Sequence, residues 1–572
     1  MQQSAKGSSP QLALPGLASK ERASKHRKRL ASAPVFKPYH QNQMMLLPPS
    51  LEELIPANHR VRLISKVVEK LDIGPVMETY KGGGTSSYHP LMLLKILLYA
   101  YVEGIYSSRL IAKAVRENVN FMWLSARQCP DFRTINNFRS GRLKAHIDSI
   151  FASLMLFLVE SGYLDLEDYF VDGSKFLANA SRYSYVWKKN VNRYQRSVLE
   201  RIQALLSQID QVNQEENRRY GDKDLEELGE QAQVDEQSQA RLVEELNERL
   251  RQLGSDEPVS EAIEQAVEDV EKAVDQQDGG KQSVKAGQHL KQIKHKLLPR
   301  LKGYQSQLEQ LGSRNSYSKT DPDATFMRLK DNALRACYNV LMGSQNGFIV
   351  NYSVHQNAAD SACFIDHMEK FKSLHNRFPE NVVGDAGIGN EENYRYVQLN
   401  GIGNYLKYNQ FHNEEKDAKK KPYSKANFTY DAQRDVYVCP EGRELVFQEQ
   451  RFQQTKTGYQ REIRRYRSVS CQGCRAHAQC CRGSGERFVE FSPLLETFKQ
   501  QVRQNLESEK GDLLARRRGV EIETVFAQLK FNKNYARFLL RGLEKINVEL
   551  GLLSIAHNLS KMFGFQPQMA LA

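Results

Sequence analysis

Two short apolar runs that each end in aspartate decide the fold: Tyr169-Phe170-Val171-Asp172-Gly173 and Asn381-Val382-Val383-Gly384-Asp385-Ala386-Gly387. Apolar runs of this length, rich in β-branched and aromatic residues and closed by glycine, are typical of buried strands. A third acid, Glu523, lies in the helix-like run 520–530. Carboxylates at the ends of two adjacent strands and on one helix can hold two divalent cations, about 3.5–4 Å apart, that clamp a phosphodiester. Such hard oxygen ligands favour Mg²⁺.

The helix-like run offers two candidates for the third acid, Glu521 and Glu523. Residues two apart point to different faces of a helix, so only one of the two can face the aspartates. Glu523 stands seven residues before Lys530, which places these two side chains on one face, two turns apart. Spacing alone leaves both glutamates open.

Composition bounds the kind of protein. A chain of 572 residues is too long for one compact core, so we expect two to four domains. Its net charge of +13 favours a polyanionic partner, usually nucleic acid, although a basic protein without such a partner would share this charge. The N-terminal 40 residues lack a secretory signal, and the apolar run 92–101 is about half the length of a membrane span. We expect a cytoplasmic protein, with no membrane partner and with access to the chromosome.

The N-terminal part divides into a basic flexible arm, 1–47, and a helical domain, 48–160. Residues 1–38 carry eight Lys or Arg against a single acid, Glu21, so this arm could lie along DNA phosphates or be a plain disordered tail. Within the helical domain, Asp131 is expected to cap a helix over 132–139. Its Arg133, Asn136 and Arg139 are predicted to contact DNA. The alternative is a helical scaffold whose arginines are merely solvated.

A long insertion, 183–316, separates the two aspartate runs. Leucine and isoleucine recur at three- and four-residue steps, as in Leu199, Ile202, Leu206 and Ile209, which predicts amphipathic helices packed in a coiled-coil-like hairpin. Between 214 and 278 the segment is rich in Glu, Asp and Gln, so it should stay off a phosphate backbone. An arm for spacing or self-association and a solvated hairpin with no partner both fit this pattern.

Five of the eight cysteines cluster between 439 and 481, within a predicted cysteine-rich insertion, 409–490. In a cytoplasmic chain such clustering favours metal over disulfides. Four thiolates make a tetrahedral structural Zn²⁺ site, and the set we predict is Cys439, Cys471, Cys474 and Cys480. Cys481 or His477 could replace one member, and a reduced thiol cluster without metal is the alternative. Cys129, Cys337 and Cys363 are isolated among apolar neighbours and are predicted to be ordinary buried thiols.

The chain resembles the DDE transposases of bacterial insertion sequences over most of its length. The stretches that carry the resemblance are Pro48–Pro56 with His59, Tyr88–Lys95, Ser107–Arg109, Pro130–Arg139, Asp172–Lys175, Ala178–Ser181, Asp321–Ala324, Tyr338–Val340, Arg541–Glu544 and Ala556–Leu559. The resemblance implies a mixed α+β fold, with a ribonuclease-H-like five-stranded sheet flanked by helices and assembled from 161–182, 317–408 and 491–565. In that fold the first and fourth strands are neighbours, which would bring Asp172 and Asp385 together.

The resemblance also implies roles for the site residues. The family pairs its catalytic glutamate with a lysine seven residues later, so Glu523 is preferred to Glu521, and Lys530 would position a phosphate. The family's usual arginine, four before the glutamate, falls at Gly519 here, and Arg518 or Arg516 could substitute for it. Lys533 and Arg537 would extend a basic ridge toward DNA if the helix continues past 530.

The function implied is transposition. Asp172, Asp385 and Glu523 would bind two Mg²⁺ ions, cut DNA at the element ends and join the 3′-hydroxyl to target DNA. The expected partners are double-stranded DNA, in the form of terminal repeats and target, and a second copy of the chain. The alternatives are a catalytically silent DNA-binding protein derived from a transposase, and a nuclease that cuts without joining.

Overall fold

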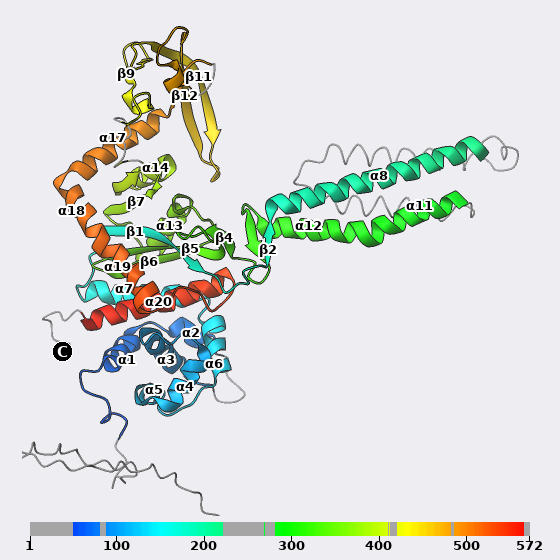
Figure 1. The fold of residues 1–572 in the computed structure, drawn as a ribbon. Coiled ribbons are helices and arrows are strands. Elements are labelled where there is room, and N and C mark those ends of the chain that lie inside the picture. Colours follow the sequence, from blue (N-terminus) through cyan, green and yellow to red (C-terminus); the bar gives the residue numbers. More distant parts are fainter. Residues whose placement is uncertain are drawn as a thin grey trace, which may run out of the picture. The chain divides into compact units, whose positions relative to one another are not determined.

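The computed structural model describes residues 50–80, 87–220, 268, 281–409, 411, 420–481 and 485–564, the side chains of 210–220 and 281–286 aside (Figure 1). The chain separates into two units, Met1–Ser50 and Leu51–Ala572, and the second is described below. The predicted basic arm, 1–47, lies outside the described residues. The fold class is α+β, as predicted.

The central sheet has six strands, so the predicted number of five is wrong. Its order is β4-β5-β1-β7-β8, with β6 also paired to β5. The extra strand exists because β5 is twelve residues long: its first residues pair with β4, and the rest pair with β6. Without β4, five strands remain, and β7 is the fourth of these along the chain. The bounds are β1 Asp168–Leu177, β4 Thr325–Arg328, β5 Leu334–Gln345, β6 Phe348–His355, β7 Asn381–Gly389 and β8 Gly403–Tyr408.

Strand register places the two aspartates side by side, toward the same end of two inner strands. β1 and β7 are parallel neighbours, with Val171 opposite Gly384, so Asp172 and Asp385 follow at the same end of both strands. This confirms that the first and fourth strands of the expected order are adjacent. On its other side, β1 runs antiparallel to β5. The β1–β5 pair is tightly packed, because a Cβ at Gly343 would stand 2.0 Å from the ring of Tyr169.

Helices cover the sheet and carry the third acid. The C-terminal helix α20 packs on β6 and is buried along most of its length, which fits the many apolar residues of its central part. One nearly continuous helical stretch carries Glu523, through α18, η5, α19 and η6. The bounds are α13 Phe364–His375, α14 Glu391–Leu399, α17 Pro493–Glu507, α18 Glu509–Arg518, η5 Gly519–Glu523, α19 Thr524–Ala527, η6 Gln528–Asn532 and α20 Leu543–Gly564.

The N-terminal part of this unit is helical, as predicted. Pro90 opens α3, and the Asp131 side chain accepts a hydrogen bond from the Thr134 amide at the start of α6. None of the helices in the described ranges is long and apolar enough to cross a membrane. The bounds are α1 Arg60–Lys70, α2 Gly74–Glu78, α3 Pro90–Val102, α4 Ser108–Glu117, α5 Val119–Leu124, α6 Phe132–Asn137, η1 Phe138–Arg142 and α7 Ile147–Glu160.

The long insertion begins and ends on a two-stranded ribbon, β2 (Tyr185–Trp187) with β3 (Ser316–Ser318). Helix α8 (Lys188–Tyr220) packs against α11 (Lys281–Gln292) and α12 (Leu298–Leu311), which are joined by η2 (Ile293–Leu297). Their shared apolar core contains the predicted periodic residues Ile202, Leu206 and Ile209. The acidic stretch predicted over 214–278 falls mostly outside the described residues.

The cysteine-rich insertion is a second antiparallel sheet, ordered β13-β12-β11-β10-β9. Aromatic side chains form its core, with Tyr437, Tyr466 and Phe491 in mutual contact. Strands β11 and β12 are the longest, and they form an extended hairpin (Figure 1). The bounds are β9 Thr429–Asp431, β10 Val436–Val438, β11 Glu444–Gln454, β12 Gln460–Ser468, α16 His477–Cys480 and β13 Phe488–Phe491.

Candidate active site

The three predicted acids converge on one cation, the guanidinium of Arg518. Its Nη2 lies 3.5 Å from Asp172 Oδ2 and 3.9 Å from Asp385 Oδ2, and its Nη1 lies 3.4 Å from Glu523 Oε1. Residues from two strands and one helix, up to 351 positions apart in the sequence, therefore face a common point. Three carboxylates around one positive group form the type of donor set that a hard divalent cation prefers.

A π-helical turn explains why Arg518 can meet Glu523. The segment η5, Gly519–Glu523, is π-helical, so residues five apart stack along the helix instead of residues four apart. Arg518 stands five before Glu523, one residue outside the expected spacing. The turn aligns the two, and the Arg518 Nη1 donates to Glu523 Oε1. Of the two alternatives left open by the sequence, Arg518 is the one at the site, whereas Arg516 is exposed and pairs with Asp512.

Glu521 has a different environment from Glu523. Its side chain is buried, and its Oε2 accepts a hydrogen bond of 2.7 Å from the Gly347 amide in the β5–β6 turn. Its Oε1 pairs with Arg517 at 3.2 Å. Glu523 is 60% exposed at its side chain and open to a ligand. Of the two glutamates, Glu523 is therefore the one that meets Arg518, the guanidinium that also faces the two aspartates.

Burial and neighbouring charge alter the protonation of Asp172. Burial, followed by repulsion from Asp385, raises the pKa of Asp172 to about 6, and the attraction of Arg518 opposes that rise. The Asp172 carboxylate is oriented by the Gly173 amide, which donates to Oδ1 at 2.8 Å. Two carboxylates this close repel each other when both are ionised, and a cation between them would stabilise both ionised forms. Within the described ranges, however, no three His, Cys, Asp or Glu side chains are arranged to hold a metal ion.

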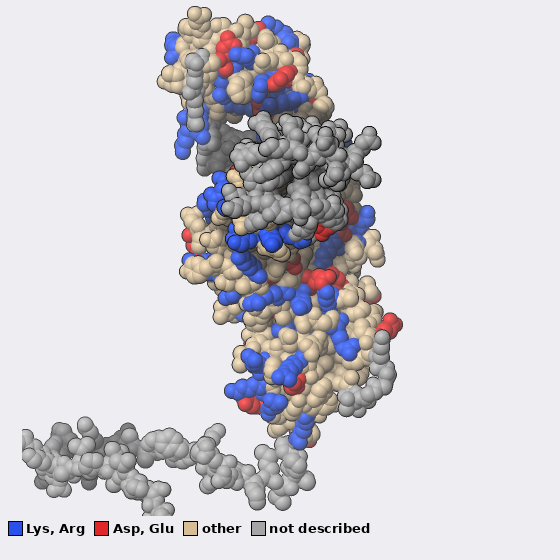
Figure 2. Space-filling model, turned by 90° about the vertical axis from the view of Figure 1, so that its right-hand side faces the viewer, with Lys and Arg blue, Asp and Glu red and all other residues tan. Residues whose placement is uncertain are grey.

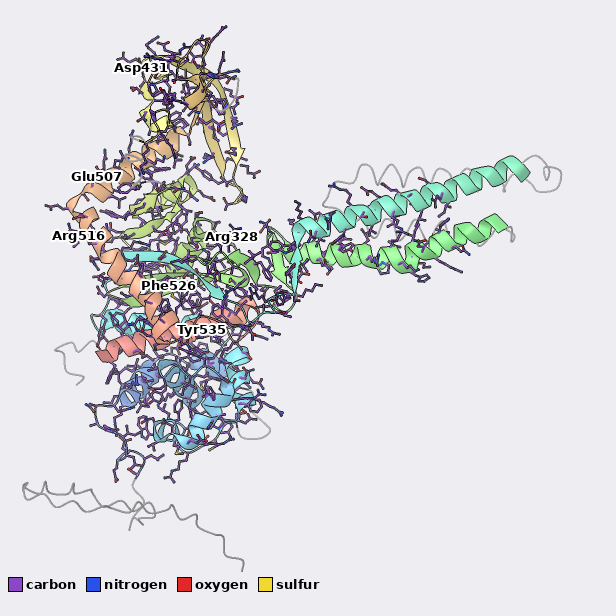
Figure 3. All side chains as sticks on the ribbon, viewed as in Figure 1. Arg328, Asp431, Glu507, Arg516, Phe526 and Tyr535 are labelled. Atoms are coloured by element: carbon purple, nitrogen blue, oxygen red, sulfur yellow. The ribbon has the colours of Figure 1, made fainter. Side chains whose placement is uncertain are left out.

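Lys530 lies beside the acids, on the same helical stretch as Glu523. Its Nζ donates to Ser174 Oγ at 2.6 Å and to the Lys175 carbonyl at 2.8 Å, both on β1. It also lies 4.4 Å from the ring centroid of Phe176 and 5.9 Å from that of Phe526, which Figure 3 labels. Burial is the largest cause that lowers the pKa of Lys530, to about 8. The predicted lysine is therefore fixed to the strand that carries Asp172.

A further acid near the site, Asp360, was not predicted from the sequence. Its Oδ1 accepts from Asn339 Nδ2 at 2.6 Å and pairs with Lys175 Nζ at 3.2 Å. The carboxylate also lies close to the backbone of Gly173, where an added Cβ would come within 2.5 Å of it. The glycine after Asp172 is thus required by this packing. The sequence gives no signal for it, because Asp360 lies in a short 3-10 turn, Asp360–Ala362, between β6 and α13.

The predicted DNA-contacting residues of the helical domain differ in exposure. Arg133 is exposed on α6, over the ring of Phe132. The guanidinium of Arg139 is buried instead, where it donates to the Tyr106 carbonyl at 2.7 Å and to Asn136 Oδ1 at 3.1 Å. This corrects the expectation that Arg139 faces DNA, because its side chain is an internal contact of the helical domain. Asn136 is half-buried as its partner.

The basic ridge past Lys530 is not helical. The helix ends at Asn532, and Asn534 has a left-handed φ of 50°. Lys533 donates to Ser560 Oγ at 3.0 Å, whereas Arg537 is exposed and donates to the carbonyls of Ala178 and Ala180. Figure 2 shows one face of the molecule, on which Lys and Arg side chains recur with Asp and Glu among them.

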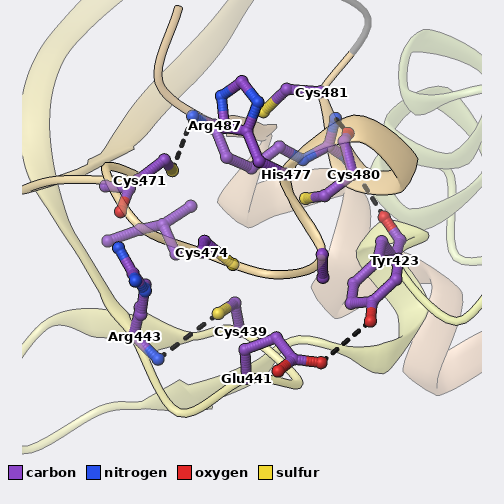
Figure 4. A pocket seen from close by; sticks show the side chains of 13 residues that line it. Tyr423, Cys439, Glu441, Arg443, Cys471, Cys474, His477, Cys480, Cys481 and Arg487 are labelled. Atoms are coloured by element: carbon purple, nitrogen blue, oxygen red, sulfur yellow. Dashed lines mark hydrogen bonds between the residues drawn. The ribbon is translucent and has the colours of Figure 1, made fainter.

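The four predicted zinc ligands line one small cavity of about 20 Å³, together with Cys481 and His477 (Figure 4). Two of the sulfurs accept backbone hydrogen bonds: the Arg443 amide donates to Cys439 Sγ at 3.3 Å, and the Arg487 amide to Cys471 Sγ at 3.4 Å. A cavity of this size holds roughly one water-sized particle. Among the described residues, which include this cluster, no three His, Cys, Asp or Glu side chains are arranged to hold a metal ion. Cys337 and Cys363 are buried, as expected, but Cys129 is exposed.

Two segments of the chain match known protein families. Residues 49–141, which include α1 to α6, match the family described as Transposase domain (DUF772). Residues 438–563, which include Glu523 and Lys530, match the family described as Transposase DDE domain. Neither a curated protein nor a solved structure matches the chain. Both matched families are transposase families, and the two matches together support the identification of the chain as a DDE transposase of an insertion sequence.

Proposed function

We propose that the chain cuts DNA at the ends of its own mobile element and joins those ends to target DNA. The observation that carries this proposal is the convergence of Asp172, Asp385 and Glu523 on Arg518. The carboxylates would hold two Mg²⁺ ions, which supply activation of the attacking oxygen and neutralisation of charge at phosphorus. The chemistry of the donor set fits, because all three groups are carboxylates that face one positive group, although among the described residues no three such side chains are spaced as metal ligands.

The proposed reaction has two displacements at phosphorus. In the first, a water oxygen attacks the phosphodiester, the bond to the 3′ oxygen breaks, and a 3′-hydroxyl and a 5′-phosphate result. In the second, that 3′-hydroxyl attacks a target phosphodiester, which forms one new ester and releases a target 3′-hydroxyl. Both are in-line reactions that positioning and charge stabilisation accelerate, so one site can perform them in turn.

The chain's own residues would position the DNA. Lys530, held by Ser174 and Phe176, presents an ammonium beside Asp172 and would bind a non-bridging phosphate oxygen. Arg518 is the counter-ion of the carboxylates before the metal ions bind, and it would turn to the DNA phosphate afterwards. Arg133, Asn136, Lys533 and Arg537 remain proposed DNA contacts. The action on two element ends favours a homodimer, working on chromosomal DNA in the cytoplasm.

Zinc in the cysteine-rich insertion is a separate proposal. It is supported by the six Cys and His side chains around one cavity and by the two amide-to-sulfur hydrogen bonds, which stabilise thiolate ligands. Elemental analysis of freshly purified protein should find about one Zn²⁺ per chain, and a protein free of zinc would refute the site.

The function is tested with the DNA that flanks the gene. Inverted repeats found there would be made into a labelled duplex and incubated with the protein, Mg²⁺ and a plasmid target. Nicked duplex together with label joined to the plasmid is the expected result. Nicking without joining would indicate a nuclease, and binding without nicking would indicate a silent DNA-binding protein.

A further inference from the structure

We propose that one face of the β11–β12 hairpin reads base pairs in the major groove of DNA. This proposal rests on the proposed function, since it names the surface that would recognise the element end. The face, called the ribbon face here, consists of alternate residues of the two strands: Gln450, Phe452, Gln454, Gln460, Glu462 and Arg464.

Strand register puts these six side chains together. Gln450 is opposite Arg464, Phe452 is opposite Glu462, and Gln454 is opposite Gln460. Since successive residues of a strand point to opposite faces, all three pairs share one side of the hairpin. The remaining pairs, such as Arg451 with Ile463, occupy the other side.

The two sides of the hairpin differ in burial. On the other side Ile463 is only 5% exposed, and Arg465 pairs with Glu449 and Glu490. On the ribbon face the three glutamines are exposed, and Phe452 is 68% exposed. Phe452 is not part of the apolar core of the insertion, which contains Tyr437, Leu445 and Tyr466.

The tip of the hairpin is bound to α14, the helix that follows the strand carrying Asp385. Thr457 Oγ1 donates to Glu392 Oε2 at 2.6 Å, and the Tyr459 hydroxyl donates to Glu391 Oε1 at 3.1 Å. Glu391 opens α14, which directly follows β7 and its Asp385. DNA whose phosphate reaches Asp385 would thus pass near the hairpin, and the ribbon face is held in place rather than on a free loop.

The spacing of the ribbon face matches that of base pairs. Alternate residues on a strand are about 6.8 Å apart, which is about two base-pair steps of roughly 3.4 Å. A two-stranded ribbon also fits the major groove, which is about 12 Å wide. Gln450, Phe452 and Gln454 would therefore face every second base pair along a stretch of about five.

The chemistry of the face suits bases. Glutamine amides pair with the N6 and N7 of adenine, and an aromatic ring contacts the thymine methyl. Arg464 pairs with Glu462 at 2.9 Å, so the one acid of the face is neutralised. Over 444–468 the chain carries six Lys or Arg and three Glu. The face has a single apolar residue, Phe452, which is little for the apolar centre of a protein–protein interface.

The test uses selection from a pool of DNA duplexes with a randomised 30-base-pair core, applied to the full chain. The test variants are Q450A/Q454A/Q460A and F452A. The matched controls are Q453A, which removes the same side chain from the other side of β11, and Q501A, on the exposed surface of α17. Thermal unfolding of each variant checks that the fold is intact.

Wild-type protein and both controls should select the same motif. The glutamine variant should lose sequence preference at the base pairs that the glutamines face, within a stretch of about five, roughly ten-fold for each glutamine removed, and keep the rest of the motif. An unchanged motif in both test variants would overturn the proposal, as would a uniform loss of affinity across all sequences, which marks phosphate contact alone. Failure of wild-type protein to cut or join its own ends would refute the proposed function instead, and leaves the selected motif as a separate result.

Discussion

Arg518 and Glu523 lie five residues apart, and their side chains meet because a π-helical turn separates them, with Nη1 3.4 Å from Oε1. The same guanidinium faces both aspartates. One guanidinium thus faces all three carboxylates and reduces the repulsion between them.

Replacing Arg518 should therefore destabilise the metal-free protein. R518A leaves three carboxylates facing one another, and we expect the free energy of unfolding to fall by roughly 1–3 kcal/mol, since the pairs are only partly buried. Added Mg²⁺ should restore more stability to R518A than to the wild type. R516A is the control, because that arginine is exposed and pairs with Asp512, away from the three acids. Denaturant titrations with and without Mg²⁺ measure both, and equal responses of R518A and R516A would contradict the prediction.

The two glutamates of the helix should separate activity from stability. E523Q, like D172N and D385N, should abolish strand cleavage and leave DNA binding nearly intact, because an amide keeps the shape and removes the charge that holds Mg²⁺. E521Q should instead lower the melting temperature, because Glu521 is buried against Gly347 and Arg517. Cleavage assays and melting curves on both variants are the measurement. An inactive but fully stable E521Q beside an active E523Q would reverse the assignment.

Lys530 should give cleavage an alkaline limit. Its pKa is lowered to about 8, so the ammonium is present below that pH and is lost above it. If the charged form binds phosphate, the cleavage rate should fall about ten-fold per pH unit above pH 8. K530R keeps its charge, so its cleavage rate should not fall above pH 8. K530M has no charge, so its cleavage should be slow at every pH. A pH–rate profile that is identical for wild type and K530R would refute the role.

Arg133 and Arg139 should behave in opposite ways. R139M removes a buried guanidinium that bonds Tyr101, the Tyr106 carbonyl and Asn136, so unfolding should become easier by about 3–5 kcal/mol. R133A removes an exposed charge, so stability should hold while DNA affinity falls and its salt dependence becomes shallower. Binding titrations at several salt concentrations, with melting curves alongside, distinguish the two. Weaker DNA binding by a stable R139M would restore Arg139 as a DNA contact.

Stability should fall in acid partly through His557. Burial lowers the pKa of this histidine to about 4, below the unfolded value of about 6.5, and it bonds the Gly347 carbonyl. The unfolded state then binds more protons between pH 6.5 and 4, so the stability present above 6.5 is lost as pH falls, by up to about 3 kcal/mol. H557N should flatten this part of the stability curve. Urea titrations at pH 4.5 to 7.5 would show it, and equal slopes for both proteins would refute the assignment.

The sequence was informative where chemistry and strand pattern coincide. The aspartates end two apolar runs, and the runs proved to be parallel neighbours with Val171 opposite Gly384. Lys530 could be placed by its spacing from Glu523. Arg518 could not be chosen over Arg516, because a π-helical turn adds one residue to the helical repeat and has no signature in the residue types of 519–523.

The burial of charged side chains could not be predicted from the sequence either. Arg139 follows Asn136 on a short polar helix, and only the packing of Tyr101 and Tyr106 against it turns its side chain inward. β4 was missed because a four-residue edge strand, Thr325–Arg328, is too short for its alternation to stand out. Asp360 reaches Gly173 through a contact between residues 187 positions apart, which no local pattern encodes.

The ribbon of β2 and β3 has a consequence for how the chain tolerates change. Tyr185 stands opposite Ser318 and Trp187 opposite Ser316, so the two ends of the long insertion leave the fold side by side. A tight turn could link Trp187 to Ser316 in place of everything between them. The length of the helical hairpin between these strands is therefore independent of the alignment of Asp172 and Asp385 on neighbouring strands.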